Sequence, residues 1–424
     1  MKLPLTRRDF VKQGALATGA VLATPHLAFA RAGAEGSADA PPIRAGLVGC
    51  GGRGTGAAED CLKSAPNVKL VALADMFPDR LESCRKYLAE AAIPGFEVTD
   101  DKCFTGFDAF KRLIDGDLDL VLLATPPGFR PLHIEAAVDA GKHVFAEKPV
   151  AVDPAGVRRV IRAGEKAREK KLGFLAGTQY RHDVMFRETV GRVHDGAIGD
   201  VLAGYAYYNT GTLWHRSREA GWSDMEWQLR NWYYFDWLSG DFIVEQHVHT
   251  IDVCNWVLKA LPVKATAVGG RQVRTDPTFG NIYDHFAVDY EYPGGVRVTS
   301  MCRQLAGAEG HVGAYFAGSK GRAAIYTGAI TGSNPFQFDG ERPNMYALEH
   351  THLIESIRAG APLNEARQVA ESSLAAILGR EAAYTGKTIT WDEMMASDMD
   401  LSPAKFEFGP LAVRPVRMPG SSAG

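Results

Sequence analysis

A glycine-rich turn directly after a short apolar run most constrains how this chain folds. Residues 43–48 (IRAGLV) have the composition of a buried strand, G-x-G-x-x-G follows at 49–54, and residues 55–64 have helical composition. In such a unit the first glycine permits a tight turn, the second lets the backbone approach a pyrophosphate, and the third lets the helix pack on the strand. The free N–H groups at the helix start then face the phosphates. The predicted cofactor contacts here are Gly49, Gly51, Gly52, Arg53 and Gly54.

Asp75 ends the next apolar run and predicts which dinucleotide binds. Residues 68–74 (VKLVALA) indicate a second strand, and Asp75 follows it, 24 positions after Gly51. A carboxylate at this place accepts hydrogen bonds from the hydroxyls of the adenosine ribose, and its charge repels a 2′-phosphate. The sequence therefore favours NAD over NADP as the cofactor.

The alternation of helical and strand-like segments continues beyond Asp75. Residues 107–114 and 133–140 have helical composition, while the apolar runs 118–124 and 143–146 suit parallel strands covered on both faces. This order predicts a doubly wound parallel sheet of the Rossmann type, in which ligands bind at the carboxyl ends of the strands.

Polar side chains follow these strands at the predicted ligand-binding edge. An ammonium group at this edge can donate a hydrogen bond to an oxygen that gains negative charge when a hydroxyl becomes a ketone. We therefore predict that Lys148, which follows one of the strands, is catalytic as well as cofactor-binding. The cofactor contacts predicted at this edge are Thr125, Pro126, His133, Glu147 and Lys148.

Composition excludes several other classes of protein. The chain has 424 residues, 46% of them hydrophobic, which is enough for two packed domains. It carries 47 Lys and Arg against 50 Asp and Glu without a long basic run, which argues against nucleic acid as a partner. We expect no membrane span, because no window is apolar over enough residues. The six cysteines form no C-x-x-C pair, so we expect no zinc site on them and treat disulfides as optional.

Residues 1–30 resemble a twin-arginine signal peptide rather than part of a fold. The stretch 6–12 (TRRDFVK) is similar to the twin-arginine consensus, and Ala-Phe-Ala at 28–30 supplies small residues at the usual cleavage spacing. Residues 31–42 are rich in Ala, Gly, Ser and Pro and indicate a flexible linker. We expect the mature protein to be periplasmic.

The stretch EQHVHTID concentrates imidazole and carboxylate groups. Apolar spacing over residues 245–258 predicts a helix on which Glu245, His249 and Asp252 share one face, while His247 projects away from that face or precedes the helix. A carboxylate one turn before a histidine orients the ring and raises its basicity, so His249 can take a hydroxyl proton. The H-x-H pair could instead bind a metal ion, but the helical spacing favours acid/base chemistry and we predict no metal.

A dense group of aromatic residues precedes this stretch. Five tryptophans and two tyrosines lie between positions 214 and 237, interleaved with Arg, His and Asn. Aromatic planes stack on the C–H faces of sugars, and polar side chains among them can bond the hydroxyls. We predict a wall of the substrate site here, with Trp232 and Tyr233 as carbohydrate contacts.

Two motifs carry a resemblance to a known family. ATPP at 124–127 and HIEAAVDAGKHVFAEKP at 133–149 resemble the Gfo/Idh/MocA oxidoreductases, and the segment 147–149 matches the E-K-P motif of that family. Members of the family act on sugars, cyclitols and their derivatives, usually with NAD(P). The resemblance therefore implies a carbohydrate-like small molecule as the substrate.

The resemblance covers residues 43–400 and implies two domains. An N-terminal Rossmann domain (43–165) would precede a C-terminal α/β domain (166–400) built on a large, open, mostly antiparallel sheet, with a tail at 401–424. Alternating segments between 201 and 317 suit such a sheet. The sheet commonly mediates dimerisation in the family, so the resemblance also implies a homo-oligomer.

The second signature of the family is D-x-G-x-H-x-x-D, and EQHVHTID aligns with it. Glu245 stands at the first Asp, His247 at the Gly, His249 at the His and Asp252 at the last Asp. The resemblance implies that Glu245 and His249 act with Lys148 in catalysis. The departure at His247 is where we expect substrate preference to be determined. The predicted substrate contacts are Tyr180, Arg181, Trp232, Tyr233, His247 and Asp252.

These observations predict an NAD-dependent oxidoreductase that acts on a hydroxyl of a sugar, glycoside or cyclitol, with Lys148 and His249 as acid/base groups. The periplasm is expected to hold no free nicotinamide pool, so an exported enzyme must keep its cofactor bound and recycle it in the same site. Two alternatives remain open. One is an NAD-dependent glycoside hydrolase that oxidises, eliminates, hydrates and reduces back, and the other is a sugar-binding protein without activity.

Overall fold

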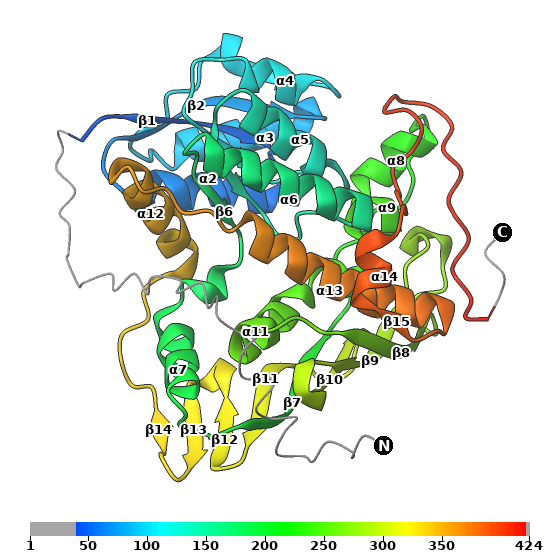
Figure 1. The fold of residues 1–424 in the computed structure, drawn as a ribbon. Coiled ribbons are helices and arrows are strands. Elements are labelled where there is room, and N and C mark those ends of the chain that lie inside the picture. Colours follow the sequence, from blue (N-terminus) through cyan, green and yellow to red (C-terminus); the bar gives the residue numbers. More distant parts are fainter. Residues whose placement is uncertain (1–39, 421–424) are drawn as a thin grey trace, which may run out of the picture. The chain divides into compact units, whose positions relative to one another are not determined.

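The computed structural model describes residues 40–420 (Figure 1). The predicted signal peptide, the predicted linker up to residue 39 and the last four residues of the tail lie outside the described residues, so export stays a prediction. Within the part of the chain that is described, no helix is long and apolar enough to cross a membrane.

Six parallel strands form the first sheet, in the order β3-β2-β1-β4-β5-β6. The order reverses between β1 and β4, which is the switch point where such sheets bind ligands. This arrangement confirms the predicted doubly wound Rossmann sheet. The strands are β1 (Ile43–Val48), β2 (Val68–Asp75), β3 (Cys103–Thr105), β4 (Leu120–Leu123), β5 (His143–Ala146) and β6 (Phe174–Ala176).

Helices cover both faces of this sheet, and for that reason β4 (LVLL) is apolar at every position. Leu120 and Leu122 belong to a cluster with α2, α3 and α12, whereas Val121 and Leu123 face the cluster of α4, α5 and α6. The helix α12 comes from the last part of the chain, so a C-terminal helix completes the Rossmann layer. These helices are α2 (Gly52–Ser64), α3 (Pro78–Glu90), α4 (Ala109–Ile114), α5 (Arg130–Asp139), α6 (Pro154–Glu169) and α12 (Met345–Arg358).

Nine strands form the second sheet, in the order β14-β13-β12-β11-β7-β10-β9-β8-β15. Only β7 and β10 pair in parallel, and the other pairings are antiparallel. This confirms the predicted large, mostly antiparallel sheet. Its strands are β7 (Val201–Thr210), β8 (Lys264–Gly270), β9 (His285–Glu291), β10 (Arg297–Gln304), β11 (His311–Gly318), β12 (Gly321–Ala324), β13 (Ala329–Gly332), β14 (Phe336–Gln337) and β15 (Ile389–Thr390).

Helices cover one face of the second sheet, and its other face carries exposed side chains. The helices α11 and α13 contact the strands on the covered face (Figure 1). On the other face Leu202, Tyr205 and Val268 are exposed. The helices of this domain are α7 (Val184–His194), α8 (Asp224–Arg230), α9 (Asp236–Ser239), α10 (Phe242–Glu245), α11 (Val248–Leu258), α13 (Ala366–Thr385) and α14 (Trp391–Ala396).

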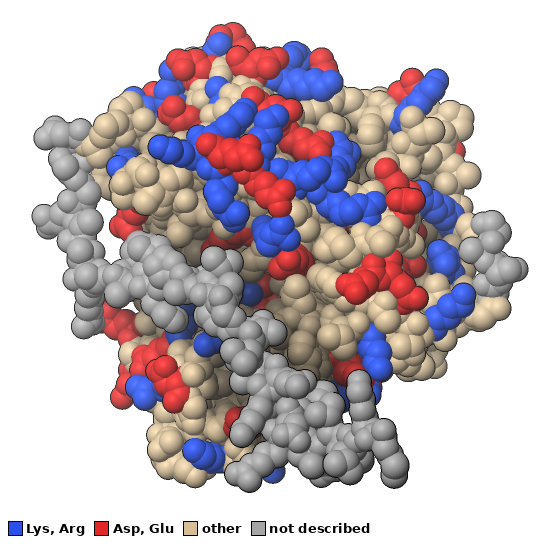
Figure 2. All heavy atoms as spheres, viewed as in Figure 1, with Lys and Arg blue, Asp and Glu red and all other residues tan. Residues whose placement is uncertain are grey.

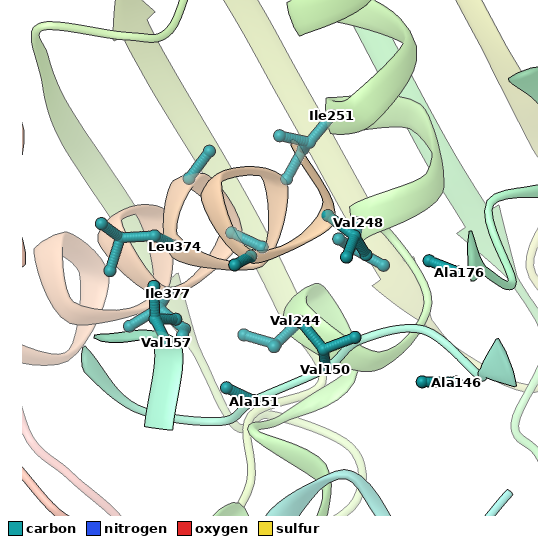
Figure 3. Close-up of a cluster of buried hydrophobic side chains, with 14 of the residues drawn as sticks. Ala146, Val150, Ala151, Val157, Ala176, Val244, Val248, Ile251, Leu374 and Ile377 are labelled. Carbon is teal, nitrogen blue, oxygen red and sulfur yellow. The ribbon is translucent and has the colours of Figure 1, made fainter. Parts of the chain in front are cut away.

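The helix α13 joins the two domains through the core. Sixteen of its 20 residues are buried, as expected for a helix that is enclosed on all sides. It contacts α6 of the Rossmann domain, β8 and β9 of the second sheet, and both α10 and α11. Figure 3 shows Leu374 and Ile377 of this helix among Val150, Val244 and Val248. The chain that follows β5 is therefore packed against α10 and α11.

Charged side chains are interspersed on the surface. On the face that Figure 2 shows, basic and acidic groups alternate over the Rossmann helices. Some form ion pairs between helices, as Lys166 of α6 does with Asp139 of α5 at 2.6 Å. The described surface on this side therefore carries charge of both signs, in line with the nearly balanced composition.

Candidate functional site

The glycine-rich turn leads from β1 into α2 and leaves the helix start open. Gly49 has a φ of +101°, which favours glycine. A Cβ on Gly54 would lie 1.8 Å from the carbonyl oxygen of Gly49, so only glycine allows this close approach. A Cβ on Gly51 or Gly52 would meet no atom within 4 Å, because both residues face open space. The first turn of α2 carries no acidic residue, so its N–H groups and helix dipole suit a phosphate.

A cleft of about 470 Å³ lies at this turn. It runs from the end of β2 to the end of β4 and so occupies the switch point of the sheet. Its residues fit a dinucleotide, because the free N–H groups at the start of α2 would meet the phosphates and the carboxylate of Asp75 would lie at the ribose. The predicted cofactor contacts that line it are Gly49, Gly51, Gly52, Arg53, Gly54, Asp75, Thr125, Pro126 and His133.

Asp75 lies at the end of β2 and is held by backbone groups. The N–H of Cys50 donates to one carboxylate oxygen at 2.6 Å, and the N–H of Phe77 donates to the other at 2.9 Å. Burial raises the pKa of the Asp75 carboxyl, while these two N–H donors and the charge of Arg80 oppose that rise. The remaining lone pairs of the carboxylate are placed to accept from a ribose.

His133 lies at the other end of the cleft as a neutral ring. Its Nδ1 is 3.1 Å from the Thr125 hydroxyl, and its ring packs between Phe110 and Phe129, with centroids 4.1 and 5.9 Å away. Burial, reinforced by the charge of Arg130, lowers the pKa of His133 to about 3. The side chain therefore contributes shape and a neutral polar edge to the cleft.

Glu147 connects the glycine-rich turn to the segment after β5 that carries Lys148. Its carboxylate lies 3.0 Å from Nε of Arg53, and Nη2 of the same arginine bonds Asp60 at 2.9 Å. Burial raises the pKa of the Glu147 carboxyl, and the charge of Arg53 opposes this. Glu147 and Lys148, which were also predicted as cofactor contacts, do not line the cleft. Glu147 is linked to the cleft through its ion pair with Arg53.

Lys148 crosses from the Rossmann domain to α10. Its Nζ donates to the carbonyl oxygen of Glu245 at 2.6 Å and to a carboxylate oxygen of the same residue at 3.1 Å. The peptide bond between Lys148 and Pro149 is cis. The two side chains are only 11% and 8% exposed, so this ion pair forms away from bulk water.

His249 lies close to Lys148 and is held neutral. Its ring meets Tyr180 edge-on, with centroids 5.5 Å apart. Burial, together with the positive charge of Lys148, lowers the pKa of His249 well below its usual range. The imidazole is therefore unprotonated near neutral pH, and it can accept a proton beside an ammonium donor.

The stretch EQHVHTID does not form one continuous helix as the spacing predicted. Glu245 ends α10, and α11 begins only at Val248, with His247 at its N-cap position. At the break the buried His247 turns toward the sheet, where its Nε2 lies 2.6 Å from the hydroxyl of Ser300 on β10. Burial lowers the pKa of His247 to about 3. Its contacts are with the sheet and not with the cleft.

Arg181 and Asp252 lie together but make no contact with Lys148 among the described residues. Nε and Nη2 of Arg181 donate to the two carboxylate oxygens of Asp252 at 2.8 and 2.9 Å, in a bidentate pair. Asp252 also accepts from Ser372 of α13 at 2.7 Å. This network links α11 to α13. Nε and Nη2 of Arg181, a predicted substrate contact, are both bonded to Asp252.

The two predicted aromatic contacts separate in the structure. Trp232 lines the nucleotide cleft, with its ring 5.9 Å from that of Trp214. Tyr233 is buried, and its hydroxyl accepts a hydrogen bond from the side chain of Gln304 at 2.8 Å. The aromatic stretch therefore serves both the cleft and the core.

Sequence reasoning missed a hydrogen-bonded chain that supports Glu245. Tyr208 of β7 donates to the amide oxygen of Gln246 at 2.8 Å, and the amide nitrogen of Gln246 donates to Glu245 at 2.5 Å. Gln246 lies inside the stretch EQHVHTID, so the sequence could have predicted that it is near Glu245. The contact of Tyr208 could not be predicted in this way, because only the strand pairing brings β7 to this site.

The described residues contain no group of three or more His, Cys, Asp or Glu side chains that could hold a metal ion. The six cysteines are free thiols, five of them buried, in line with small apolar core residues.

A Rossmann domain with a dinucleotide cleft, joined to a second domain that brings a histidine and a carboxylate to a lysine, is the architecture of a two-domain class of nucleotide-dependent oxidoreductases. Residues 43–173 match the family model described as "Oxidoreductase family, NAD-binding Rossmann fold". Residues 186–324 match the "GFO/IDH/MocA C-terminal domain". The two matches together cover more than half of the sequence, and the chain belongs to the Gfo/Idh/MocA oxidoreductase family.

Named relatives include dehydrogenases and glycosyl hydrolases. Inositol 2-dehydrogenase 3 from Saccharopolyspora erythraea is 27% identical over 259 residues, which is 60% of this chain and 65% of that protein. Glycosyl hydrolase family 109 protein 1 from Bacteroides fragilis is 32% identical over 162 residues, which is 38% of this chain and 33% of that protein. The matches thus span less than two thirds of the length of either relative.

Solved structures share the fold. The structure of scyllo-inositol dehydrogenase from Lactobacillus casei, which contains NAD(H) and scyllo-inositol, is 21% identical with a TM-score of 0.63. The alignment covers 82% of this chain and 99% of that one. The likeness extends over both domains and therefore supports the two-domain architecture.

We expect Gly54→Ala to weaken dinucleotide binding at least about tenfold, because the added Cβ forces the turn away from the Gly49 carbonyl oxygen. Titration with NADH, followed by its fluorescence, measures the affinity. Gly191→Ala on α7 is the matched control, since a Cβ there meets nothing within 4 Å. Equal affinities of the two variants would contradict the assignment of the turn.

Proposed function

We propose that this protein is an NAD-dependent oxidoreductase acting on a hydroxyl of a sugar, glycoside or cyclitol. One observation carries the proposal: an ammonium group, a carboxylate and a neutral imidazole, from Lys148, Glu245 and His249, gather beyond the dinucleotide cleft. Glu147 links this group to the cleft through Arg53. Such a set can move a proton and stabilise a developing oxyanion, which is what alcohol oxidation requires.

In the proposed oxidation the substrate hydroxyl lies between His249 and Lys148. The neutral imidazole of His249 accepts the hydroxyl proton, and the Lys148 ammonium donates a hydrogen bond to the oxygen that becomes a carbonyl. When bound, the nicotinamide supplies the acceptor for the hydride that leaves the carbon. Glu245 acts as a positioning residue, because both its carbonyl and its carboxylate bond Nζ of Lys148.

Support for a polyol substrate comes from a relative. The protein from Saccharopolyspora erythraea that matches 60% of this chain is named for oxidising inositol, a ring that carries only hydroxyl groups. The described site also offers hydroxyl partners, since Tyr180 contacts the ring of His249 and Tyr208 lies one hydrogen bond from Gln246. We place the substrate ring beside these two tyrosines.

We further propose that the cofactor stays bound and is recycled in the same site. The reason is the predicted twin-arginine signal at residues 6–12, because an exported enzyme would meet no free nicotinamide. Immunoblotting of periplasmic and cytoplasmic fractions tests the export. Absorbance of the supernatant after denaturation tests the bound cofactor, and a protein purified without any NAD(H) contradicts it.

A second candidate function is an NAD-dependent glycoside hydrolase. The observation that favours it is the 32% identity over 162 residues to a protein named as a member of glycosyl hydrolase family 109. Such a reaction also begins with oxidation of a hydroxyl, so Lys148 and His249 would keep their roles. Release of the aglycone from an aryl glycoside without net NADH would identify this activity and displace the leading proposal.

We expect Lys148→Met and His249→Gln each to lower turnover by about 10²-fold or more, because each removes a group that acts on the substrate oxygen. Polyols and aryl glycosides serve as substrates, and the bound NAD is quantified in every variant. Lys387→Met is the matched control, since Lys387 is exposed and lies just after the end of α13, outside the candidate site. Full turnover in either variant that retains NAD would refute the assigned role.

We expect Asp75→Ser to raise the affinity for NADP relative to NAD by about tenfold or more, because it removes a negative charge from the predicted ribose site. Arg80 remains in the same cleft and can then attract a 2′-phosphate. Titration with both reduced cofactors gives the ratio, and Asp115→Ser, at an exposed position, is the control. An unchanged ratio contradicts the NAD preference.

We also propose a homo-oligomer formed through the open face of the second sheet. Leu202, Tyr205 and Val268 are 61%, 42% and 70% exposed on strands of this sheet, and exposed apolar side chains at this density suit an interface. We expect light scattering to give a multiple of the chain mass for the unaltered protein and a lower mass for Tyr205→Glu. Val273→Glu, 57% exposed in a loop, is the control. A monomeric unaltered protein would overturn the proposal.

A further inference from the structure

The C-terminal domain supplies one wall of the dinucleotide cleft. Trp214, Arg216, Arg230 and Trp232 line the same cleft as the glycine-rich turn and Asp75. All four come from residues 211–238, which follow β7 and which we call the cover segment. Their aromatic and cationic side chains therefore face the cofactor position rather than the group of Lys148 and His249.

Arg230 fastens the cover segment to the ribose end of the cleft. Its Nη1 lies 3.2 Å from the carboxylate of Asp79, and its Nε bonds Glu226 at 3.0 Å. The guanidinium also lies 3.8 Å from the ring centroid of Phe77, a geometry in which a cation is attracted to the ring. Phe77 and Asp79 lie two and four positions after Asp75, so this anchor is close to the predicted ribose contact.

The C-terminal tail supports the cover segment from outside. The N–H of Met225 donates to the carbonyl oxygen of Gly409 at 3.1 Å, and the side chain of Gln228 donates to the carbonyl oxygen of Leu411 at 2.7 Å. The N–H of Leu411 donates in turn to Asp224 at 3.1 Å. Figure 1 shows the tail running beside α8 and α9. Residues 401–411 are thus hydrogen-bonded to α8 of the cover segment.

The same tail packs on the rim of the cleft. Phe408 contacts Phe77 and Phe107, with ring centroids 6.2 and 5.1 Å apart, and Phe406 contacts Phe129 at 5.3 Å. Phe77, Phe107 and Phe129 all line the cleft. They belong, with Trp227 and Trp237 of the cover segment, to a hydrophobic cluster separate from the main core. This cluster closes the outer side of the cofactor position.

Two of the arginines that line the cleft have no carboxylate within ion-pair distance among the described residues. Arg80 of α3 and Arg216 of the cover segment both line the cleft, and neither forms an ion pair within the described residues. Burial and then the charge of Arg216 lower the pKa of the Arg80 guanidinium. The charges of Asp75 and Asp79 oppose this fall in the pKa of Arg80, but neither carboxylate forms an ion pair with it. A further anion stabilises two such neighbouring cations, and a dinucleotide would bring phosphates to this cleft.

We propose that the cover segment, supported by residues 401–411, is a clamp that retains the dinucleotide between turnovers. Trp214 and Trp232 close over the cofactor, and Arg216 and Arg80 bind its phosphates. The inference rests on the proposed function only in requiring that the cofactor is a dinucleotide. It assigns cofactor retention, rather than substrate binding, to the aromatic stretch that precedes EQHVHTID.

The test is the rate at which bound NADH leaves the full-length protein. Protein loaded with NADH is mixed with a large excess of NAD, and the loss of NADH fluorescence gives the release rate. We expect the double substitution Trp214→Ala and Arg216→Ala to speed release at least about tenfold, because it removes a ring and a cation from the cleft wall. Glu219→Ala is the control, since Glu219 is exposed in the same segment and outside the cleft lining.

A second variant tests the support from the tail without altering the cleft wall. Phe408 is half exposed, and Phe408→Ala leaves Trp214 and Arg216 intact. We expect intermediate release rates for this variant, with the melting temperature measured alongside. Release at the unaltered rate in both variants refutes the clamp, even if Lys148→Met abolishes turnover. Failure of the unaltered protein to bind any dinucleotide refutes the clamp and the proposed function together.

Discussion

The contact between Lys148 and Glu245 is the constraint on which the rest of the site depends, because it joins the two domains. Lys148 follows β5 of the Rossmann sheet, and Glu245 ends α10 of the second domain. Both side chains are almost buried, and leaving one member of such a pair without its partner costs roughly 3–5 kcal/mol. The packing of α13 against α6, α10 and α11 holds the segment after β5 and the end of α10 next to one another. The position of Lys148 relative to His249 is therefore set by the core and not by a flexible loop.

The Rossmann half of the fold could be predicted because its signals are local. Each apolar run of the first domain became a strand, and the turn requires glycine at Gly49 and Gly54, the first and last glycines of the motif, while Gly51 faces open space. The stretch EQHVHTID was predicted less well, since helical spacing alone suggested one helix through Glu245 and His249. At the break His247 contacts Ser300, which is 53 positions away in the sequence. Periodicity within a segment carries no information about such a partner.

The ligand of the aromatic stretch between residues 214 and 237 could not be predicted from its composition either. Its composition suits a sugar or a nucleotide equally well, because both present faces that stack on aromatic rings. Which of the two it meets depends on where the segment lies, and that is fixed by residues far along the chain. The side chain of Gln228 bonds Leu411, 183 positions later, and Arg230 bonds Asp79, 151 positions earlier. Contacts with the C-terminal tail and with α3 of the Rossmann domain thus hold Trp232 where it lines the nucleotide cleft.

The charges around the glycine-rich turn support the proposed clamp. Arg53 lies in that turn, but its Nε and Nη2 are already bonded to Glu147 and Asp60, and so its charge is largely balanced by two carboxylates. The phosphates are then left with the N–H groups at the start of α2, whose attraction is modest, about 0.3–1 kcal/mol for the helix dipole at an exposed site. Arg80 and Arg216 are the arginines of the described cleft lining that form no ion pair, although Asp75 and Asp79 act electrostatically on Arg80, and Arg216 comes from the cover segment. In the proposed clamp, retention of the cofactor is therefore shared between Arg80 of the Rossmann domain and Arg216 of the second domain, while Arg53 holds the segment after β5 that carries Lys148.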